Sequence, residues 1–167
     1  MRKAQGLTLM ELLVALALLA VLAALATPAL ESLRLNATRA ATMEGLLRAA
    51  WYARSEAVRR GSAVVLCPAG AGGACLPRRE AWGRGWTVAG AAAPDMPLRT
   101  GPGVRHARVA LLANRDAFTF ETRDRRSTNG TLAWCDPRGA SASRAIVISP
   151  TGRPRLEHGS GSLECPP

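Results

Sequence analysis

The feature that most constrains this chain is an apolar run near its N-terminus. From Leu12 to Leu30 no residue carries a charge, and nearly all are leucine, alanine or valine. As a helix this run would extend roughly 28 Å, about the thickness of the hydrocarbon core of a bilayer. Arg2 and Lys3 precede it and favour an N-terminus in the cytoplasm. The sequence therefore predicts a single helix that crosses a membrane, with the rest of the chain on the other side.

A secretory signal peptide is the alternative interpretation of this segment. Ala24-Leu25-Ala26 offers the small-residue cleavage site that a signal peptide needs. Glu11 argues against it, because a signal peptide has no use for an acid at the start of its apolar region. The helical pattern also continues past the run without a break. We therefore expect the apolar run to remain part of the protein.

One long helix is predicted from about Thr8 to Arg60. Pro28 lies inside it, removes one backbone hydrogen bond and is expected to kink or loosen the helix locally. Gly61 has the position typical of a residue just after a helix end. Beyond Pro28, apolar residues recur at steps near three and four, which predicts a face that packs on a globular core. These residues are Leu33, Ala37, Ala40, Met43, Leu47, Trp51 and Val58.

After Gly61 short β-runs replace the helical pattern. The glycine-rich and proline-rich stretch 90–103 is expected to form a loop, and Asn129-Gly130 predicts a hairpin between the strands on either side of it. The expected fold class is α+β, a long N-terminal helix packed on a C-terminal antiparallel β-sheet. The expected strands span residues 62–67, 85–89, 107–112, 117–121, 131–135 and 144–149. The expected parts of the chain are the membrane helix 7–30, the amphipathic helix 31–61 and the β-rich head 62–167.

The chain is strongly basic. Its formal net charge is +10, and all 22 basic residues except Lys3 are arginines. Arginine stays ionised at physiological pH and binds phosphate through a bidentate fork, so an acidic partner is expected. With 167 residues, of which 48% are hydrophobic, the composition excludes a disordered chain, a polytopic membrane protein and a large multidomain enzyme.

All four cysteines follow the apolar run, and their even number on the non-cytoplasmic side indicates two disulfides. Three pairings are possible. We favour Cys67 with Cys75, which closes a glycine-rich loop, and Cys135 with Cys165, which fastens the C-terminal tail. A zinc site is the rival interpretation, but the sequence contains no Cys-x-x-Cys pair. No metal or other cofactor is expected.

No pattern in the sequence points to catalysis. Neither His106 nor His158 belongs to a recognisable nucleophile motif, and Asp136 stands before a proline in what is expected to be a turn. The glycine-rich stretch 69–73 lacks the lysine of a phosphate-binding loop. We therefore predict that the chain is not an enzyme.

The N-terminal residues Gly6-Leu7-Thr8-Leu9-Met10-Glu11-Leu12-Leu13-Val14 resemble the class III signal of type IV pilins and type II secretion pseudopilins. The resemblance implies that a prepilin peptidase removes the leader 1–6 by cutting after Gly6 and that the new N-terminal residue, Leu7, is methylated. Leu7 departs from the phenylalanine that is usual in the family. A carboxylate such as Glu11 at the edge of an apolar span costs a few kcal/mol unless it is paired. The amine that cleavage creates at Leu7 is its natural partner, and we expect the two groups to pair between staggered helices of neighbouring subunits in a filament.

The head resembles the GspH/FimT branch of the same superfamily in segments from Val65 to Arg155, which implies the pilin fold. GspH proteins are minor pseudopilins of type II secretion. FimT proteins are minor type IV pilins, and in some bacteria they bind DNA during natural transformation through a C-terminal Gly-Arg-x-Arg element. That element maps onto Gly152, Arg153 and Arg155 here, with Pro154 between the arginines. The matching segments are Val65-Leu66-Cys67-Pro68, Gly85-Trp86, 130–135 and 146–155.

Elementary chemistry makes the same element a plausible phosphate site. Gly152 would let the backbone approach a phosphate closely, and Arg153 and Arg155 would point the same way from an extended segment. Further arginines that would widen the patch are Arg123, Arg125, Arg126, Arg138 and Arg144. The sequence thus predicts a FimT-type minor pilin that moves from the bacterial inner membrane into a pilus. Its expected partners are double-stranded DNA, other pilins and the prepilin peptidase. The alternative is a GspH-type pseudopilin that serves protein secretion and binds no DNA.

Overall fold

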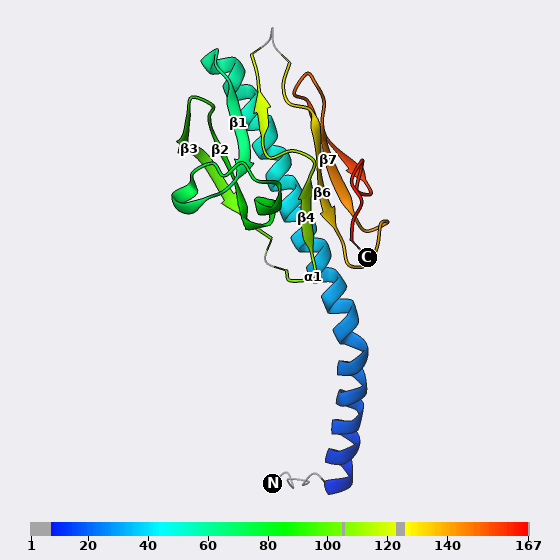
Figure 1. Cartoon of the computed structure of the whole chain (residues 1–167). Helices are drawn as coiled ribbons and strands as arrows, with labels where there is room; N and C mark the ends of the chain where they lie inside the picture. The colour runs from blue at the N-terminus through cyan, green and yellow to red at the C-terminus, as the bar shows by residue number, and fades with distance from the viewer. Residues whose placement is uncertain (1–7, 105, 123–125, 167) are drawn as a thin grey trace. The chain divides into compact units, whose positions relative to one another are not determined.

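The computed structural model of the chain describes residues 8–104, 106–122 and 126–166. Helix α1 (Leu9–Arg60) continues through Pro28, and a β-rich head follows it (Figure 1). The chain divides into two compact units, Met1–Thr38 and Arg39–Pro167, so the second unit includes the last turns of α1. The predicted cleavage residues Gly6 and Leu7, and the candidate arginines Arg123 and Arg125, lie outside the described residues.

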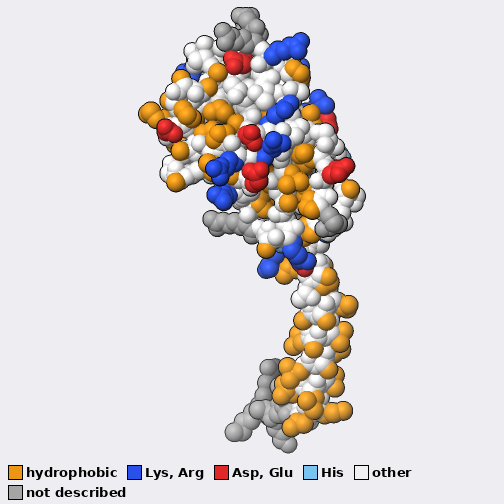
Figure 2. Space-filling view, viewed as in Figure 1, with side chains coloured by type: hydrophobic (Ala, Val, Ile, Leu, Met, Phe, Trp, Pro, Cys, Tyr) orange, Lys and Arg blue, Asp and Glu red, His pale blue; other side chains and the backbone are white. Residues whose placement is uncertain are grey.

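The described part of the first unit is a helix whose large apolar side chains are exposed from Leu9 to Leu33 (Figure 2). The helix begins with a capping interaction, in which the backbone N–H of Glu11 donates to Thr8 Oγ1 at 3.3 Å. By length and composition alone, this helix is able to cross a membrane. An apolar surface of this extent requires lipid or neighbouring helices around it.

Two four-stranded antiparallel sheets form the head, where the sequence analysis expected a single sheet. The first has the order β3-β2-β1-β5 and the second the order β4-β6-β7-β8. The expectation of a helix packed on antiparallel β-structure is therefore confirmed. The strands of the first sheet are β1 (Val64–Pro68), β2 (Gly85–Gly90), β3 (Ala93–Pro102) and β5 (Phe118–Phe120). Those of the second are β4 (Ala110–Ala113), β6 (Gly130–Cys135), β7 (Arg144–Ile148) and β8 (Pro154–His158).

The last turns of α1 share one apolar core with both sheets. The predicted helix face is only partly right: Met43 is buried, but Trp51 is 43% and Val58 41% exposed. The buried face consists mainly of small side chains, and alanine lets a helix approach two sheets closely where larger side chains would hold them apart. The fully buried helix residues are Leu46, Ala49, Ala50, Ala53 and Ala57.

Two local predictions about the strands are wrong. The expected loop 90–103 contains strand β3, which pairs with β2 over Gly85–Gly90. β3 lies at the edge of its sheet, where no further strand needs the N–H groups that its prolines lack. Pairing with β2 therefore makes this segment a strand although its composition is typical of a loop. Asn129-Gly130 does not form a hairpin, because β5 pairs with β1 whereas β6 pairs with β4 and β7. The chain changes sheets at this point.

Both disulfides occur in the pairing that the sequence analysis favoured. Cys67–Cys75 closes the loop after β1, and Cys135–Cys165 joins β6 to the C-terminal tail. The tail also lies against the second sheet, where the hydroxyls of Ser162 and Thr131 are 3.0 Å apart. The C-terminal segment is therefore fastened to the head rather than free.

A buried carboxylate ties the end of β6 to the helix. The Asp136 side chain is fully buried and accepts hydrogen bonds from Nε and Nη2 of Arg138, each at 2.8 Å. The Arg138 guanidinium lowers the pKa of Asp136 from 3.8 to about 2. Arg39 Nη1 lies 3.8 Å from Asp136 Oδ2 and donates to the carbonyl of Ala142 at 2.6 Å. Arg39 thus fastens the 136–143 turn to α1, and Arg138 neutralises the carboxylate from within the turn.

Candidate nucleic-acid interface

The turn between β7 and β8 carries the predicted Gly-Arg-x-Arg element. Gly152 adopts a φ of +72°, in the left-handed region that favours glycine, and its N–H donates to the Ser149 carbonyl at 2.8 Å. The N–H of Ser149 donates to the Arg153 carbonyl at 3.1 Å, and the N–H of Arg153 donates to Ser149 Oγ at 3.1 Å. Three hydrogen bonds therefore close the turn on itself and fix the start of β8.

Two distant segments pack against this turn. Arg54 of α1 donates from Nη1 to the Thr151 carbonyl, and the N–H of Ser127 donates to the Pro150 carbonyl at 3.0 Å. Gly152 is buried between them: a Cβ at this position would lie 2.7 Å from Ser127 Oγ and 3.1 Å from Arg54 Nη1. The sequence analysis expected Gly152 to admit a phosphate, but the structure gives it a different role. Its missing side chain lets α1 and the 126–128 segment hold the turn in place.

Both arginines of the element project from this anchored turn into solvent. Gly152 and Pro154 are buried, whereas Arg153 and Arg155 are exposed, as expected for alternate residues of an extended segment. Arg155 donates from Nε to Glu157 Oε1 at 2.5 Å, with the two side chains 62% and 36% exposed. An ion pair in such an exposed position contributes only about 0–1 kcal/mol. Arg155 is therefore able to exchange Glu157 for a phosphate oxygen at small cost.

The other candidate arginines divide between the two ends of the second sheet. Arg126 is exposed and adjoins Ser127, so it lies beside the turn. Arg144 begins β7 and is paired with His158, about 13 Å along the strand from the turn by strand rise. Its Nη1 donates to the carbonyls of Ser141 and Ser143, and Arg138 is bound to Asp136. The structure therefore brings Arg126, Arg153 and Arg155 to one end and places Arg138 and Arg144 at the other.

The C-terminal end of α1 adds basic residues that the sequence analysis did not include among the candidate binding residues. Buried Glu56 accepts hydrogen bonds from Nε of Arg59 at 2.9 Å and from Nε of Arg60 at 2.5 Å, and these bonds lower its pKa from 4.5 to about 2. The Glu56 carboxylate thus partly neutralises both arginines. Arg54 was missed because its partner Thr151 is 97 residues away in sequence, and no local pattern reports such a contact.

Residues 42–152 of the chain match a family model described as type II transport protein GspH. The chain belongs to the GspH family. Residues 1–27 match the prokaryotic N-terminal methylation motif, so this member has the N-terminus of a pilin-like protein as well as the head. Together with the apolar helix, the motif indicates a membrane-anchored subunit. The GspH match ends at Gly152, so Arg153 and Arg155 lie beyond it.

The fold is similar to that of a solved minor pilin. The type IV minor pilin FimU of Pseudomonas aeruginosa strain PAO1 is 26% identical with a TM-score of 0.57, over 71% of this chain and 87% of FimU. A second crystal form of FimU, also 26% identical, has a TM-score of 0.53 over 68% of this chain and 88% of FimU. A search among curated proteins found no match. Pilins and GspH proteins are structural proteins that assemble with other pilins into filaments.

Proposed function

We propose that this GspH-family protein is a minor type IV pilin whose head binds double-stranded DNA for uptake in natural transformation. The observation that supports DNA binding best is the anchored turn from Ser149 to Arg153, which presents Arg153 and Arg155 in solvent beside Arg126. A rigid support limits the entropy that the site loses when a ligand binds. The similarity to FimU supports the pilus assignment.

The chemistry of the site favours the DNA backbone over the bases. Arginine forms bidentate, charge-assisted hydrogen bonds with phosphate, and contacts to phosphates carry no sequence information directly. Each phosphate that is neutralised releases counterions, so the affinity falls as salt is added. We expect binding that is independent of sequence and steeply sensitive to salt.

Replacing Arg153 and Arg155 together by glutamine is expected to weaken DNA binding about tenfold or more at low salt, because two phosphate contacts are lost. The slope of log affinity against log salt concentration should also become shallower by about 2. The measurement is fluorescence anisotropy of a labelled duplex, with the full chain in detergent micelles and a series of NaCl concentrations.

The matched control is the double replacement Arg78→Gln and Arg84→Gln, which removes the same charge from exposed positions elsewhere on the head. This control should bind DNA nearly as well as the unaltered chain. Equal losses in both double variants would show that net charge alone attracts DNA. Unchanged binding in the Arg153/Arg155 variant would remove the turn from the site.

We further propose the maturation and topology that the methylation motif supports. A prepilin peptidase cuts after Gly6, Leu7 is methylated, and the Glu11 carboxylate pairs with the Leu7 amine of a neighbouring subunit. The N-terminus faces the cytoplasm and the head the periplasm, where disulfides such as Cys135–Cys165 persist. The subunit then leaves the inner membrane for the pilus.

Intact mass spectrometry tests the maturation step. A chain isolated from cells with an active prepilin peptidase should lack residues 1–6 and carry one added methyl group. Gly6→Val should keep the full mass, because a larger side chain before the scissile bond blocks the peptidase. An unaltered chain that stays uncut in such cells would contradict the proposal.

A minor pseudopilin of type II secretion is the second candidate, favoured by the description of the family model. It would share the membrane helix, the maturation and the filament contacts, since these depend on the N-terminal motif. It would need no DNA contact at Arg153 and Arg155. The anisotropy measurement therefore separates the two candidates.

A further inference from the structure

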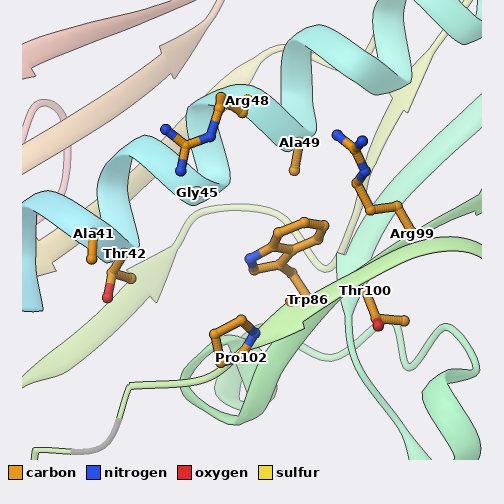
Figure 3. A pocket seen from close by; sticks show the side chains of 10 residues that line it. Ala41, Thr42, Gly45, Arg48, Ala49, Trp86, Arg99, Thr100 and Pro102 are labelled. Carbon is orange, nitrogen blue, oxygen red and sulfur yellow. The ribbon is translucent and has the colours of Figure 1, made fainter.

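A groove lies between α1 and strand β3 in the head, away from the arginine turn. It encloses about 310 Å³. The helix side is made of small residues one turn apart, Ala41, Gly45 and Ala49, and the other side is the segment from Arg99 to Pro102 (Figure 3). Small side chains on the helix leave room for the main chain of a ligand to come close.

A nearly buried tryptophan forms the floor of this groove. Trp86 is 8% exposed, and its indole lies against Gly101, where an added Cβ would overlap the ring. Figure 3 shows the indole beneath the helix, with its nitrogen at the end of the ring away from Arg99. Among the residues that the structure describes, no hydrogen-bond acceptor is found for Trp86 Nε1. An indole N–H that has no acceptor within the protein is free to donate to an acceptor oxygen of a ligand in the groove.

Two arginines make the rim of the groove cationic. The Arg99 guanidinium lies 4.5 Å from the centre of the Tyr52 ring, a cation–π contact that holds it in position. No carboxylate pairs with Arg99 within the described part of the chain. Arg48 lies across the groove and pairs with Glu44 at 3.2 Å, but these side chains are 66% and 63% exposed, so the pair is weak. The rim therefore favours an anionic ligand.

From these contacts we infer that the groove binds an acidic, extended segment of a neighbouring filament subunit. An aspartate or glutamate of that segment pairs with the guanidinium of Arg99 or Arg48, and Trp86 Nε1 donates to an oxygen elsewhere on the same segment. β3 is the outer strand of its sheet, so its free edge offers main-chain groups to an extended peptide. DNA suits the groove less well, because a tryptophan this deeply buried presents no open ring face for a base to stack on. The inference rests on filament assembly and is independent of DNA binding at Arg153 and Arg155.

The test follows the indole N–H signal of Trp86 by ¹H–¹⁵N NMR on the full chain in detergent micelles. Trp86→Phe assigns the signal among the four tryptophans. The probe is the capped peptide acetyl-Leu-Glu-Leu-amide, and its isostere acetyl-Leu-Gln-Leu-amide is the reference. The acidic peptide should shift the Trp86 signal in a saturable way, and the neutral peptide should bind about tenfold more weakly because a charge-assisted bond is lost.

Arg99→Gln should weaken binding of the acidic peptide about tenfold, since one charge-assisted contact is removed. Arg99 is exposed on an edge strand, so this variant is expected to fold. Arg78→Gln, which removes the same charge from an exposed position elsewhere on the head, should leave peptide binding unchanged. Equal shifts with the two peptides, or no shift with either, would overturn the inference. A Trp86 shift with duplex DNA or inorganic phosphate but not with the acidic peptide would also overturn it and would assign the groove to phosphate.

Discussion

Replacing Asp136 by alanine is expected to lower the free energy of unfolding of the head by about 3 kcal/mol. The Asp136 carboxylate is fully buried and receives two hydrogen bonds from Arg138, with Arg39 at 3.8 Å. Its removal takes a buried negative charge away from two partly buried guanidinium groups. It also removes one of the two contacts of Arg39 with the 136–143 turn, which is why the loss should exceed that of a surface pair.

Urea unfolding followed by tryptophan fluorescence measures this change, because all four tryptophans lie after Thr38 and report on the head. Asp116→Ala is the matched control. Asp116 also pairs with an arginine, Arg79, at 3.3 Å, but the two side chains are 56% and 57% exposed. Its loss should cost less than about 1 kcal/mol. Equal effects of the two replacements would contradict the role given to burial.

Acid supplies a second readout of the same contact. The pKa of Asp136 is lowered from 3.8 to about 2 in the folded head, and that of Glu56 from 4.5 to about 2. A lowered carboxylate pKa stabilises the fold above the unfolded value, and this stability is lost as pH falls toward the folded value. Stability should therefore decline between about pH 4.5 and pH 2. The Asp136→Ala head should lose less over that interval than the unaltered head.

Replacing Cys135 and Cys165 by alanine is expected to destabilise the head by about 3–4 kcal/mol, from the chain entropy that the cross-link removes from the unfolded state. This disulfide spans 30 residues, whereas Cys67–Cys75 spans 8. The shorter loop should contribute about 2–3 kcal/mol, so its double replacement is the matched comparison. Both double variants remove the same kinds of atoms, so the difference between their losses in stability reports on loop length. We therefore expect the Cys135/Cys165 variant to lose more stability than the Cys67/Cys75 variant.

Thermal unfolding monitored by tryptophan fluorescence provides the measurement. The Cys135/Cys165 variant should melt about 10 °C below the unaltered chain, and the Cys67/Cys75 variant should lie between them. A larger loss from the shorter cross-link would show that local packing around Cys67 outweighs loop length. Four free thiols in chain isolated from an oxidising compartment would exclude the entropic argument altogether.

Local chemistry explains what was predictable about the fold. The apolar run after Glu11, the helix to Arg60 and most short strands follow from periodicity and from glycine and proline positions, which act over a few residues. The sequence left three cysteine pairings open, and the one that it favoured is present. Strand β3 was missed because only its pairing with β2 makes the 93–102 segment extended.

In the candidate interface, too, some residues were predictable from the sequence and others are set by tertiary contacts. Arg153 and Arg155 were named from the resemblance to FimT proteins, and their shared exposed face follows from the alternation of side chains along an extended segment. The contact of Arg54 with Thr151, and the burial of Gly152 against Ser127, join segments that are far apart in the chain. No local pattern encodes such contacts.

The amino-acid order alone thus determined a membrane-compatible helix, an antiparallel head and a basic surface, because each depends on residue type and short spacing. It favoured one of three cysteine pairings, and the structure shows that pairing. Tertiary structure alone decided that the head has two sheets, that α1 buries alanines rather than Trp51, and that Asp136 is enclosed by two arginines. It also decided that Trp86 lies beneath a cationic rim. These features arise where elements distant in sequence compete for the same space, and packing density rather than local preference settles that competition.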